Sequence, residues 1–201
     1  MSHDKSGPQS GRPTLWLVRH GETEWSRSGQ YTGLTDIPLL PEGEEQARAA
    51  GDTLAAAGVE FSLVMSSPLQ RAWRTAELAG FAQAERVPHA HEWDYGEYEG
   101  VPSQDIRAQN PDYRIWDDGV PGGEELAQVA ARADRIIERV RTELADHEHA
   151  ILFSHGHFSR VMVARWLGLP PQTGRHFLLG TAKAARLGWD KTTPAVLGWG
   201  L

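Results

Sequence analysis

Short apolar runs alternate along this chain with longer segments whose apolar positions recur at helical spacing. A brief apolar run bounded by turn residues predicts a strand, and apolar positions three and four residues apart predict a helix. The predicted strands are 14–18, 61–65, 85–87 and 150–154, with further candidates at 176–179, 184–189 and 195–199. The predicted helices are 41–57, one with Pro68 in its first turn, 103–110, 124–145 and 157–167. This alternation of strands and helices indicates an α/β fold.

Two polar segments between these elements, 21–40 and 116–123, are predicted to be loops. A structureless loop as long as 21–40 is unusual in a compact domain and is more often functional. Four of its side chains can bind an anion, namely Ser26, Arg27, Tyr31 and Thr32. For each of them the alternative, a solvated loop residue, stays open.

Two of the predicted strands end in a histidine that is followed by glycine. Arg19-His20-Gly21 follows the first strand, and His155 with its glycine follows the strand at 150–154. Gly21 is expected to let the chain turn sharply through a positive φ. Ligands of open α/β sheets bind outside the carboxyl ends of the strands, so both histidines can face one pocket if their strands are neighbours. A guanidinium can hold phosphate oxygens while an imidazole nitrogen attacks phosphorus, which favours phosphoryl chemistry over a solvated turn.

A third strand end leads to another arginine. The strand at 61–65 runs into the helix that begins near Pro68, and Arg71 lies about one turn into that helix. This position aims both a helix N-terminus and a guanidinium toward the same crevice. Arg74 lies a further turn away and is expected on the surface.

The segment 89–100 is too rich in acidic and aromatic residues for a simple linker. We expect one carboxyl group here, walled by Trp93 and Tyr95, to be kept protonated by desolvation and to serve as a general acid. A solvated acidic loop is the expected environment of Glu97 and Glu99.

The composition excludes several classes of function. The chain has 201 residues, of which 40% are hydrophobic, and this suits a single domain at 14–201. The formal net charge of -7 argues against nucleic-acid binding, so a phosphate site needs positive charge that is concentrated locally. There is no cysteine, which excludes disulfides, a thiol nucleophile and cysteine-ligated metals.

The start of the chain carries no targeting signal that we can identify. The segment 1–13 is polar, contains Pro8 and Pro13, and lacks the apolar core of a signal peptide. No apolar run in the chain approaches the roughly 18 residues of a membrane span. We therefore expect 1–13 to be a disordered lead-in, and the protein to be cytoplasmic with no membrane partner.

Four segments, in this order along the chain, resemble the successive motifs of the histidine phosphatase superfamily, which includes the phosphoglycerate mutases. They are LVRHGETEW at 17–25, SSPLQRA at 66–72, EWDYG at 92–96 and SHGH at 154–157. The resemblance implies a phosphoglycerate mutase-like fold, which is a single three-layer domain with a mostly parallel central sheet and helices on both faces. Within the superfamily, the chain is most similar to the sedoheptulose-1,7-bisphosphatase type, and a group of small bacterial acid phosphatases is comparably similar. The segments that carry this closer likeness are 25–36, 93–96 and 115–119.

The site residues of the superfamily can be carried onto this chain one by one. The resemblance implies that His20 is the nucleophile and becomes phosphohistidine, and that Glu92 donates a proton to the leaving oxygen. The residues implied to contact the phosphoryl oxygens are Arg19, Arg71, His155, Ser26, Thr32, Gly33 and, through its backbone N–H, Gly156. Two arginines and a histidine then neutralise the transferred charge, so we expect no metal and no cofactor.

Departures from the mutase pattern favour hydrolysis. Ser26 stands where the mutases carry asparagine, Trp93-Asp94 stands where they carry Arg-His, and the chain is shorter than theirs. We therefore predict a phosphatase that acts on small phosphorylated metabolites, above all sugar phosphates or bisphosphates. A broad-specificity acid phosphatase and a cofactor-dependent phosphoglycerate mutase are the alternatives. The natural substrate and the oligomeric state, for which a homodimer is considered, stay open, and Lys183 is expected on the surface.

Two unrelated classes of function are also considered. The His-x-His pairs at 89/91, 147/149 and 155/157 could ligate zinc, but the neighbouring arginines would repel a metal ion. A phosphate-binding module without catalysis should have lost a site residue, and here every implied catalytic residue is present. Catalysis is therefore the favoured hypothesis.

Overall fold

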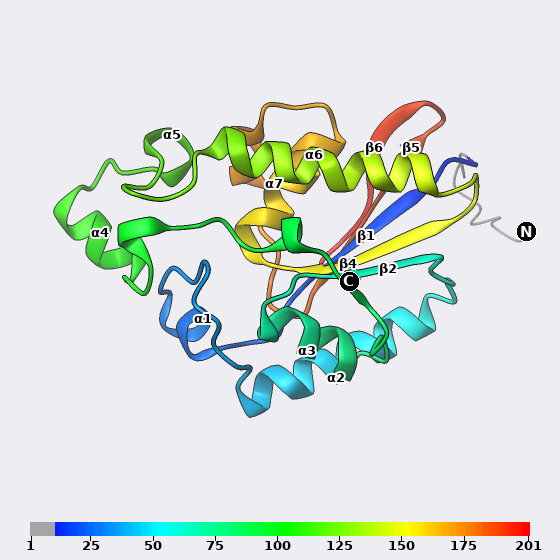
Figure 1. The fold of residues 1–201 in the computed structure, drawn as a ribbon, viewed down its shortest axis with the longest axis horizontal. Coiled ribbons are helices and arrows are strands. Elements are labelled where there is room, and N and C mark those ends of the chain that lie inside the picture. The colour runs from blue at the N-terminus through cyan, green and yellow to red at the C-terminus, as the bar shows by residue number, and fades with distance from the viewer. Residues whose placement is uncertain (1–10) are drawn as a thin grey trace, which may run out of the picture.

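The middle layer of the computed structural model, which describes residues 11–201, is a six-stranded sheet in the order β3-β2-β4-β1-β5-β6 (Figure 1). The strands are β1 (Thr14–Arg19), β2 (Leu63–Ser66), β3 (Glu85–Arg86), β4 (His149–Ser154), β5 (Ala184–Asp190) and β6 (Thr193–Trp199). The strands from β3 to β1 in this order run parallel, and β5 pairs antiparallel with both β1 and β6. The predicted α/β domain with a mostly parallel sheet is confirmed.

Helices cover both faces of this sheet. The helices α2 (Pro41–Ala56) and α3 (Gln70–Leu78) lie on one face, and α6 (Leu126–Glu143) and α7 (Gly156–Trp166) lie on the other (Figure 1). The shorter elements are α1 (Glu24–Ser28), α4 (Ser103–Gln109), α5 (Ile115–Asp118) and the 3-10 turns η1 (Pro88–Ala90), η2 (Gly96–Tyr98) and η3 (Pro171–His176). The arrangement is the three-layer one that the family resemblance implies.

The side chains of β1 alternate between two apolar cores. Leu15 and Leu17 pack with the side chains of α6 and α7. Trp16 and Val18 pack with side chains of α2 and α3 on the opposite face. Because successive strand residues point to opposite faces, a strand covered on both sides needs a continuous apolar run. This explains why an unbroken apolar segment marks a central strand of the sheet.

The register of β1 and β4 brings the two histidine-bearing strand ends together. These strands are adjacent and parallel, with Arg19 opposite Ser154. The backbone N–H of His20 donates to the carbonyl of Ser154 at 2.9 Å. On the other side of β4, the N–H of Ser67 at the end of β2 donates to the carbonyl of Phe153 at 2.9 Å. Three strands therefore deliver polar residues to the same carboxyl edge of the sheet.

Both predicted loops contain a short helix, so the prediction of structureless loops is wrong. Within 21–40, Thr23 caps α1: its Oγ1 accepts from the N–H of Ser26 at 3.1 Å, and the Ser26 Oγ accepts from the Thr23 N–H at 2.9 Å. This reciprocal cap satisfies two backbone donors and stabilises a helix too short to show periodicity. At 116–123, α5 begins one residue earlier and buries Trp116.

Two further boundaries differ from the sequence prediction. The segment 176–179 is not a strand, since its two leucine carbonyls accept from the Trp199 indole and from the Arg19 Nη1, both at 2.8 Å, and so are not part of the sheet ladder. The helix α3 begins at Gln70, so Pro68 lies before the helix rather than in its first turn.

Gly21 is required for close packing and not for a positive φ, which corrects the expectation. It is absent from the glycines with positive φ in the described part of the chain. A Cβ at Gly21 would lie 2.2 Å from the carbonyl oxygen of Gly43, and a Cβ at Gly43 would lie 2.1 Å from the carbonyl oxygen of Glu22. The start of α2 therefore packs directly against the backbone that follows His20.

The predicted lead-in at 1–13 lies mostly outside the described residues, which begin at residue 11. The guanidinium of Arg12 lies 4.8 Å from the centre of the Trp189 ring, and the carbonyl of Pro13 accepts from the Trp189 indole at 2.9 Å. The last residues of that segment thus pack against β5. Between residues 11 and 201, no helix has the length and apolar character needed to cross a membrane.

Candidate active site

His20, the first residue after β1, is buried, with 4% of its surface exposed. Its Nδ1 lies 2.7 Å from the carbonyl oxygen of Gly21, and because a carbonyl only accepts, Nδ1 carries the ring proton. This tautomer leaves a lone pair on Nε2. Burial, together with the charges of Arg71 and Arg19, holds the pKa of His20 well below its usual value of 6.5. The imidazole is therefore neutral and nucleophilic at neutral pH.

Three buried nitrogen atoms near His20 have no hydrogen-bond partner among the described residues: Nε of Arg19, Nε of Arg71 and Nδ1 of His155. Buried polar atoms are nearly always paired in folded proteins, so each unpaired atom needs an explanation. All three can donate a hydrogen bond, and the oxygens of a phosphoryl group only accept. Three unpaired buried donors near one imidazole are the main indication of an anion site.

Arg71 lies near His20, as predicted. Most of its hydrogen bonds, however, go to backbone carbonyls of a loop and do not leave its donors free for phosphoryl oxygens. Its terminal nitrogens donate to the carbonyls of Thr32, Gly33 and Thr35, at 3.1, 2.7 and 2.8 Å. These bonds hold the loop rather than aim at a ligand, because carbonyls in a segment without regular structure need donors from elsewhere. The unpaired Nε is the part of Arg71 that can contact a phosphoryl oxygen.

Glu99 holds the same loop from the other side. Its carboxylate accepts from the N–H of Gly33 at 2.9 and 3.0 Å and from the N–H of Thr35 at 3.1 Å. The expectation that Glu99 is solvated is therefore wrong, because backbone donors replace its water, whereas Glu97 is exposed as predicted. The N–H of Gly33, whose residue the resemblance places at the phosphoryl oxygens, is already engaged here.

His155, the N-cap of α7, is fully buried, and its ring centroid lies 5.3 Å from that of His20. Its Nε2 lies 2.7 Å from the Oγ of Ser67. Burial, the charge of Arg71 and the neighbouring His20 lower the pKa of His155 well below its usual value. With Nε2 engaged by the hydroxyl, Nδ1 is the atom that can contact a ligand beside His20.

Glu92 is buried, with 4% of its surface exposed. Its Oε1 accepts from the N–H of Trp93 at 2.9 Å and of Phe158 at 2.7 Å, and its Oε2 accepts from the N–H of His157 at 2.9 Å. The last two donors belong to the first turn of α7, where a negative group is stabilised. The carboxyl group of Glu92 is thus not simply walled by aromatic rings, as predicted, because three backbone donors replace the water that burial removes.

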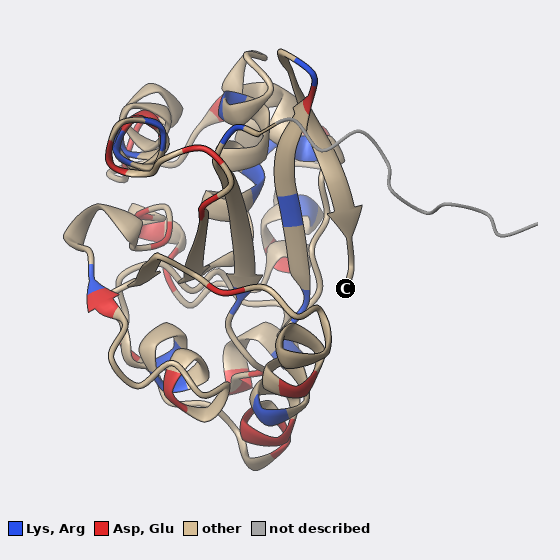
Figure 2. Cartoon of the chain, turned by 90° about the vertical axis from the view of Figure 1, so that its right-hand side faces the viewer, with Lys and Arg blue, Asp and Glu red and all other residues tan. Residues whose placement is uncertain are grey.

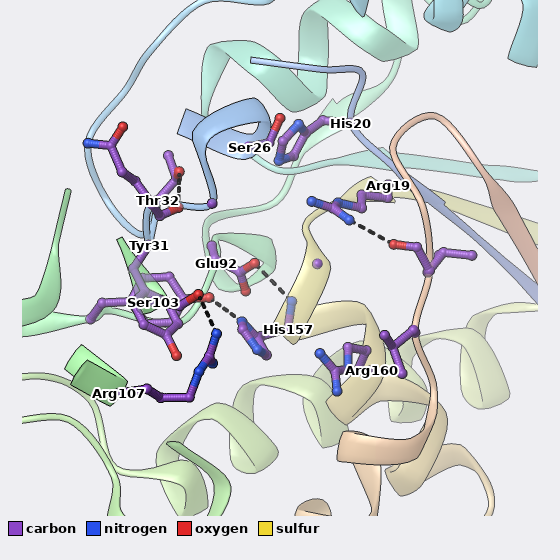
Figure 3. Close-up of a pocket in the computed structure, with 16 residues that line it drawn as sticks. Arg19, His20, Ser26, Tyr31, Thr32, Glu92, Ser103, Arg107, His157 and Arg160 are labelled. Carbon is purple, nitrogen blue, oxygen red and sulfur yellow. Dashed lines mark hydrogen bonds between the residues drawn. The ribbon is translucent and has the colours of Figure 1, made fainter. Parts of the chain in front are cut away.

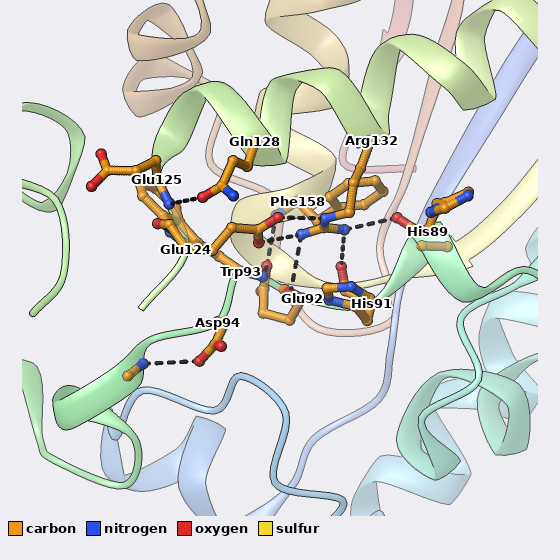
Figure 4. Close-up of polar contacts among 12 residues, drawn as sticks. His89, His91, Glu92, Trp93, Asp94, Glu124, Glu125, Gln128, Arg132 and Phe158 are labelled. Atoms are coloured by element: carbon orange, nitrogen blue, oxygen red, sulfur yellow. Dashed lines mark hydrogen bonds and ion pairs between the residues drawn. The ribbon is translucent and has the colours of Figure 1, made fainter. Parts of the chain in front are cut away.

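The segment that carries Glu92 is held by Arg132 on α6 (Figure 4). Arg132 donates to the carbonyls of His89, His91 and Glu92, and it pairs with Glu124 through two bonds of 2.7 Å. Both side chains of this pair are nearly buried, at 10% and 13% exposure. The sequence offered one signal for this contact, which is an arginine within the apolar stripe of the clearest predicted helix.

A cavity of about 310 Å³ opens next to His20 (Figure 3). Of the residues that the family resemblance assigns to the site, those lining it are Arg19, His20, Ser26, Thr32, Glu92 and Gly156. Those that do not line it are Gly33, Arg71 and His155. Tyr31 lines it as an anion-binding candidate of the 21–40 segment. His157, considered from the sequence only as a zinc ligand, also lines it, and the lining residues that the sequence did not single out include Ser103, Arg107, Arg160, Leu178 and Leu179.

Three basic residues considered from the sequence, Arg27, Arg74 and Lys183, also do not line this cavity. Arg27, expected as an anion ligand, pairs instead with Glu22 at 2.7 Å and Glu42 at 3.3 Å, because these carboxylates flank it at the surface. Arg74 pairs with two surface glutamates, as its predicted exposure requires. Lys183 is exposed, as predicted.

The histidines of the 155/157 pair have separate partners. His155 contacts Ser67, whereas the Nδ1 of His157 lies 2.6 Å from the hydroxyl of Tyr95. Burial, followed by the charges of Arg160 and Arg19, lowers the pKa of His157 to about 3. Across residues 11–201, no group of three or more histidine, aspartate or glutamate side chains could hold a metal ion.

Known proteins resemble this chain over most of its length. A family model described as the histidine phosphatase superfamily, branch 1, matches residues 15–201. An acid phosphatase of Mycobacterium tuberculosis is 39% identical over 176 residues, which are 88% of this chain and 86% of the relative. A sedoheptulose 1,7-bisphosphatase of Saccharomyces cerevisiae is 34% identical over 188 residues, covering 80% of this chain and 69% of the relative. The solved structure of an open reading frame product from Mycobacterium tuberculosis matches with a TM-score of 0.86 and 38% identity, covering 94% of this chain and 97% of that one.

The ion pair between Arg132 and Glu124 predicts a large effect on stability. We expect Arg132→Met to lower the free energy of unfolding by about 3–5 kcal/mol, because it leaves the Glu124 carboxylate buried and unpaired. Urea unfolding followed by circular dichroism measures the change. The control Arg139→Met removes an arginine from more exposed pairs and should cost less than about 1 kcal/mol. Equal losses in the two variants would show that the Arg132–Glu124 ion pair is not a buried pair that the fold depends on.

The lowered pKa of His157 predicts a dependence of stability on pH. Because this pKa is about 3 in the folded chain and 6.5 in the unfolded one, only the unfolded chain takes up the proton between these values. The stabilising contribution is fully present above pH 6.5 and is lost toward pH 3, at about 1.4 kcal/mol per pH unit. In urea unfolding at several pH values, His157→Gln should therefore lose stability with acid less steeply than the wild type. An unchanged slope would show that folding does not lower the pKa of His157.

Proposed function

The chain belongs to branch 1 of the histidine phosphatase superfamily, and we propose on this premise that it hydrolyses small phosphorylated metabolites, above all sugar phosphates or bisphosphates, through a phosphohistidine on His20. One observation carries the proposal: a neutral His20 with a lone pair on Nε2 lies beside three unpaired buried nitrogen atoms. This arrangement supplies a nucleophile and donors for the phosphoryl oxygens. The relatives named acid phosphatase and sedoheptulose 1,7-bisphosphatase support it.

In the first step, the Nε2 of His20 attacks phosphorus in line with the ester oxygen. The N–P bond forms as the P–O bond breaks, and the charge on the phosphoryl oxygens is neutralised by donors from Arg19, Arg71 and His155. Glu92, having taken up a proton, passes it to the leaving oxygen, which departs as an alcohol.

In the second step, water replaces the alcohol. Glu92, now a carboxylate, removes a proton from the water molecule as its oxygen attacks phosphorus. The N–P bond breaks, inorganic phosphate leaves and His20 returns to its neutral form. The backbone donors that hold Glu92 stabilise its carboxylate between the two steps.

Hydrolysis is favoured over the mutase reaction by the residue that follows the catalytic glutamate. Where the mutases carry an arginine after the catalytic glutamate, Trp93 is fully buried and its indole donates to the carbonyl of Glu124 at 2.6 Å. That position therefore contributes no cation to a substrate. The broad-specificity alternative is favoured by Leu178, which is 69% exposed beside the cavity and can contact apolar leaving groups.

A panel of phosphorylated metabolites tests this function directly. We expect phosphate release from sugar phosphates and bisphosphates to exceed both phosphate release from nucleotides and the interconversion of phosphoglycerates. His20→Ala should abolish release from every substrate, because the nucleophile is missing, while the exposed control His176→Ala should leave it unchanged. Interconversion that outpaces phosphate release would place the chain with the mutases, and full activity of His20→Ala would remove His20 from its role.

The role of Glu92 predicts a dependence on the leaving group. A sugar alcohol needs a proton to leave, whereas p-nitrophenolate leaves without one. Glu92→Gln should therefore lower kcat on a sugar phosphate by about a hundredfold or more, and by less than about tenfold on p-nitrophenyl phosphate. The exposed Glu97→Gln serves as the matched control. Equal losses on both substrates would assign the proton to another carboxyl group.

A further inference from the structure

Two arginines line the cavity away from His20: Arg107 on α4 and Arg160 on α7 (Figure 3). Together with Arg19 they make the cavity wall positive, against the single carboxylate of Glu92, although the whole chain carries a formal net charge of -7. Arg19 lies next to His20 and serves the phosphoryl group there. The reaction at His20 leaves Arg107 and Arg160 without a role.

Arg160 is held in place by the surrounding protein. Its Nε donates to the carbonyl of Gly174 at 3.0 Å, and its Nη2 donates to the carbonyl of Arg175 at 2.6 Å. Its guanidinium lies 4.8 Å from the centre of the Trp116 ring. These contacts fix the side chain but do not neutralise it, since in the described part of the chain it forms no ion pair. A fixed guanidinium can bind an anion at little cost in conformational entropy.

Arg107 acts on the same part of the cavity from α4. Its one side-chain hydrogen bond, from Nη2 to the Oγ of Ser103, is long at 3.3 Å, and its side chain is exposed. Burial raises the pKa of the Tyr31 phenol, and the charges of Arg107 and Arg160 both oppose this rise. Tyr31 itself is fixed against Tyr95, with ring centroids 4.7 Å apart. The charges of both guanidinium groups therefore reach the hydroxyl of Tyr31, and all three residues line the same cavity.

We propose that Arg107 and Arg160 bind a second phosphate of the substrate, at the end remote from the phosphate that His20 receives. The inference rests on the proposed function for the reaction at His20. A small metabolite with two phosphates pairs these guanidinium groups, whereas one with a single phosphate leaves them unpaired. Contacts to the remote phosphate can orient the reacting one. The cavity of about 310 Å³ lies at the lower end of the usual range for small-molecule sites, which suits a sugar-sized ligand.

The test compares fructose 1,6-bisphosphate with fructose 1-phosphate and fructose 6-phosphate. Two quantities are measured: kcat/KM for phosphate release by the active protein, and Kd by calorimetry in the His20→Ala background, which needs no turnover. With both arginines present, we expect kcat/KM of the wild type and Kd of His20→Ala each to favour the bisphosphate by about tenfold or more. Arg107→Gln and Arg160→Gln should each reduce that preference by about tenfold. Arg135→Gln, an exposed arginine on α6, is the matched control and should leave it unchanged.

The outcomes separate the subsite from the reaction. Equal values for mono- and bisphosphate, or a preference that survives both substitutions, would overturn the subsite. A stronger, arginine-dependent preference for 3-phosphoglycerate would overturn the second phosphate in favour of a carboxylate. If no substrate were turned over, p-nitrophenyl phosphate included, while the Kd preference remained, the proposed reaction would fail and the subsite would stand. If Arg160→Gln does not fold, Arg160→Lys takes its place. This variant keeps the positive charge but loses the two parallel donors of the guanidinium, so its preference for the bisphosphate should be weaker than that of the wild type but not abolished.

Discussion

The parallel pairing of β1 with β4 is the constraint on which the rest of the structure depends. The bond from the His20 N–H to the Ser154 carbonyl, 2.9 Å long, continues the register past the strand ends and sets His20 beside His155. A slip of one residue would turn every side chain of a strand to the opposite face. It would exchange the apolar positions of both cores and separate the two imidazoles. The packing of the core and the geometry of the site are therefore set by one register.

Acidic and basic positions are spread over the helices and loops of the chain (Figure 2), whose formal net charge is -7. The site, in contrast, brings together positive charge and unpaired donors. Each buried donor without a partner costs about 1–3 kcal/mol, a cost that the two apolar cores must offset. Because these donors are already oriented, they need little reorganisation when charge moves onto a transferred phosphoryl group. Arg132 and Glu99 complement them: one holds the segment that carries Glu92, and the other holds the loop that Arg71 also binds.

The features best predicted from the sequence are those that local patterns of residues determine. The ends of apolar strands located His20 and His155, and strand alternation with helices predicted the layered fold. Arg71 was located but its contacts were not, because its acceptors are backbone carbonyls of a loop, which any residue type can provide. Arg107 and Arg160 could not be found from spacing, since they come from separate helices and only the tertiary fold brings them to one cavity. Gly21 was identified for the wrong reason, because its close neighbour in the fold is distant in the sequence.

Covalent transfer to His20 is the central claim, and trapping the intermediate tests it most directly. Rapid acid-free quenching during turnover, followed by peptide mass spectrometry, should show one phosphoryl group on the peptide that contains His20. The modification should be labile in acid and stable in base, as expected of a phosphoramidate, and absent from His20→Ala. A modification on a different residue, or one that resists acid, would contradict the account. The account would also be contradicted if the protein turned substrate over rapidly, under conditions in which breakdown of the intermediate limits the rate, and no phosphorylated protein were detected.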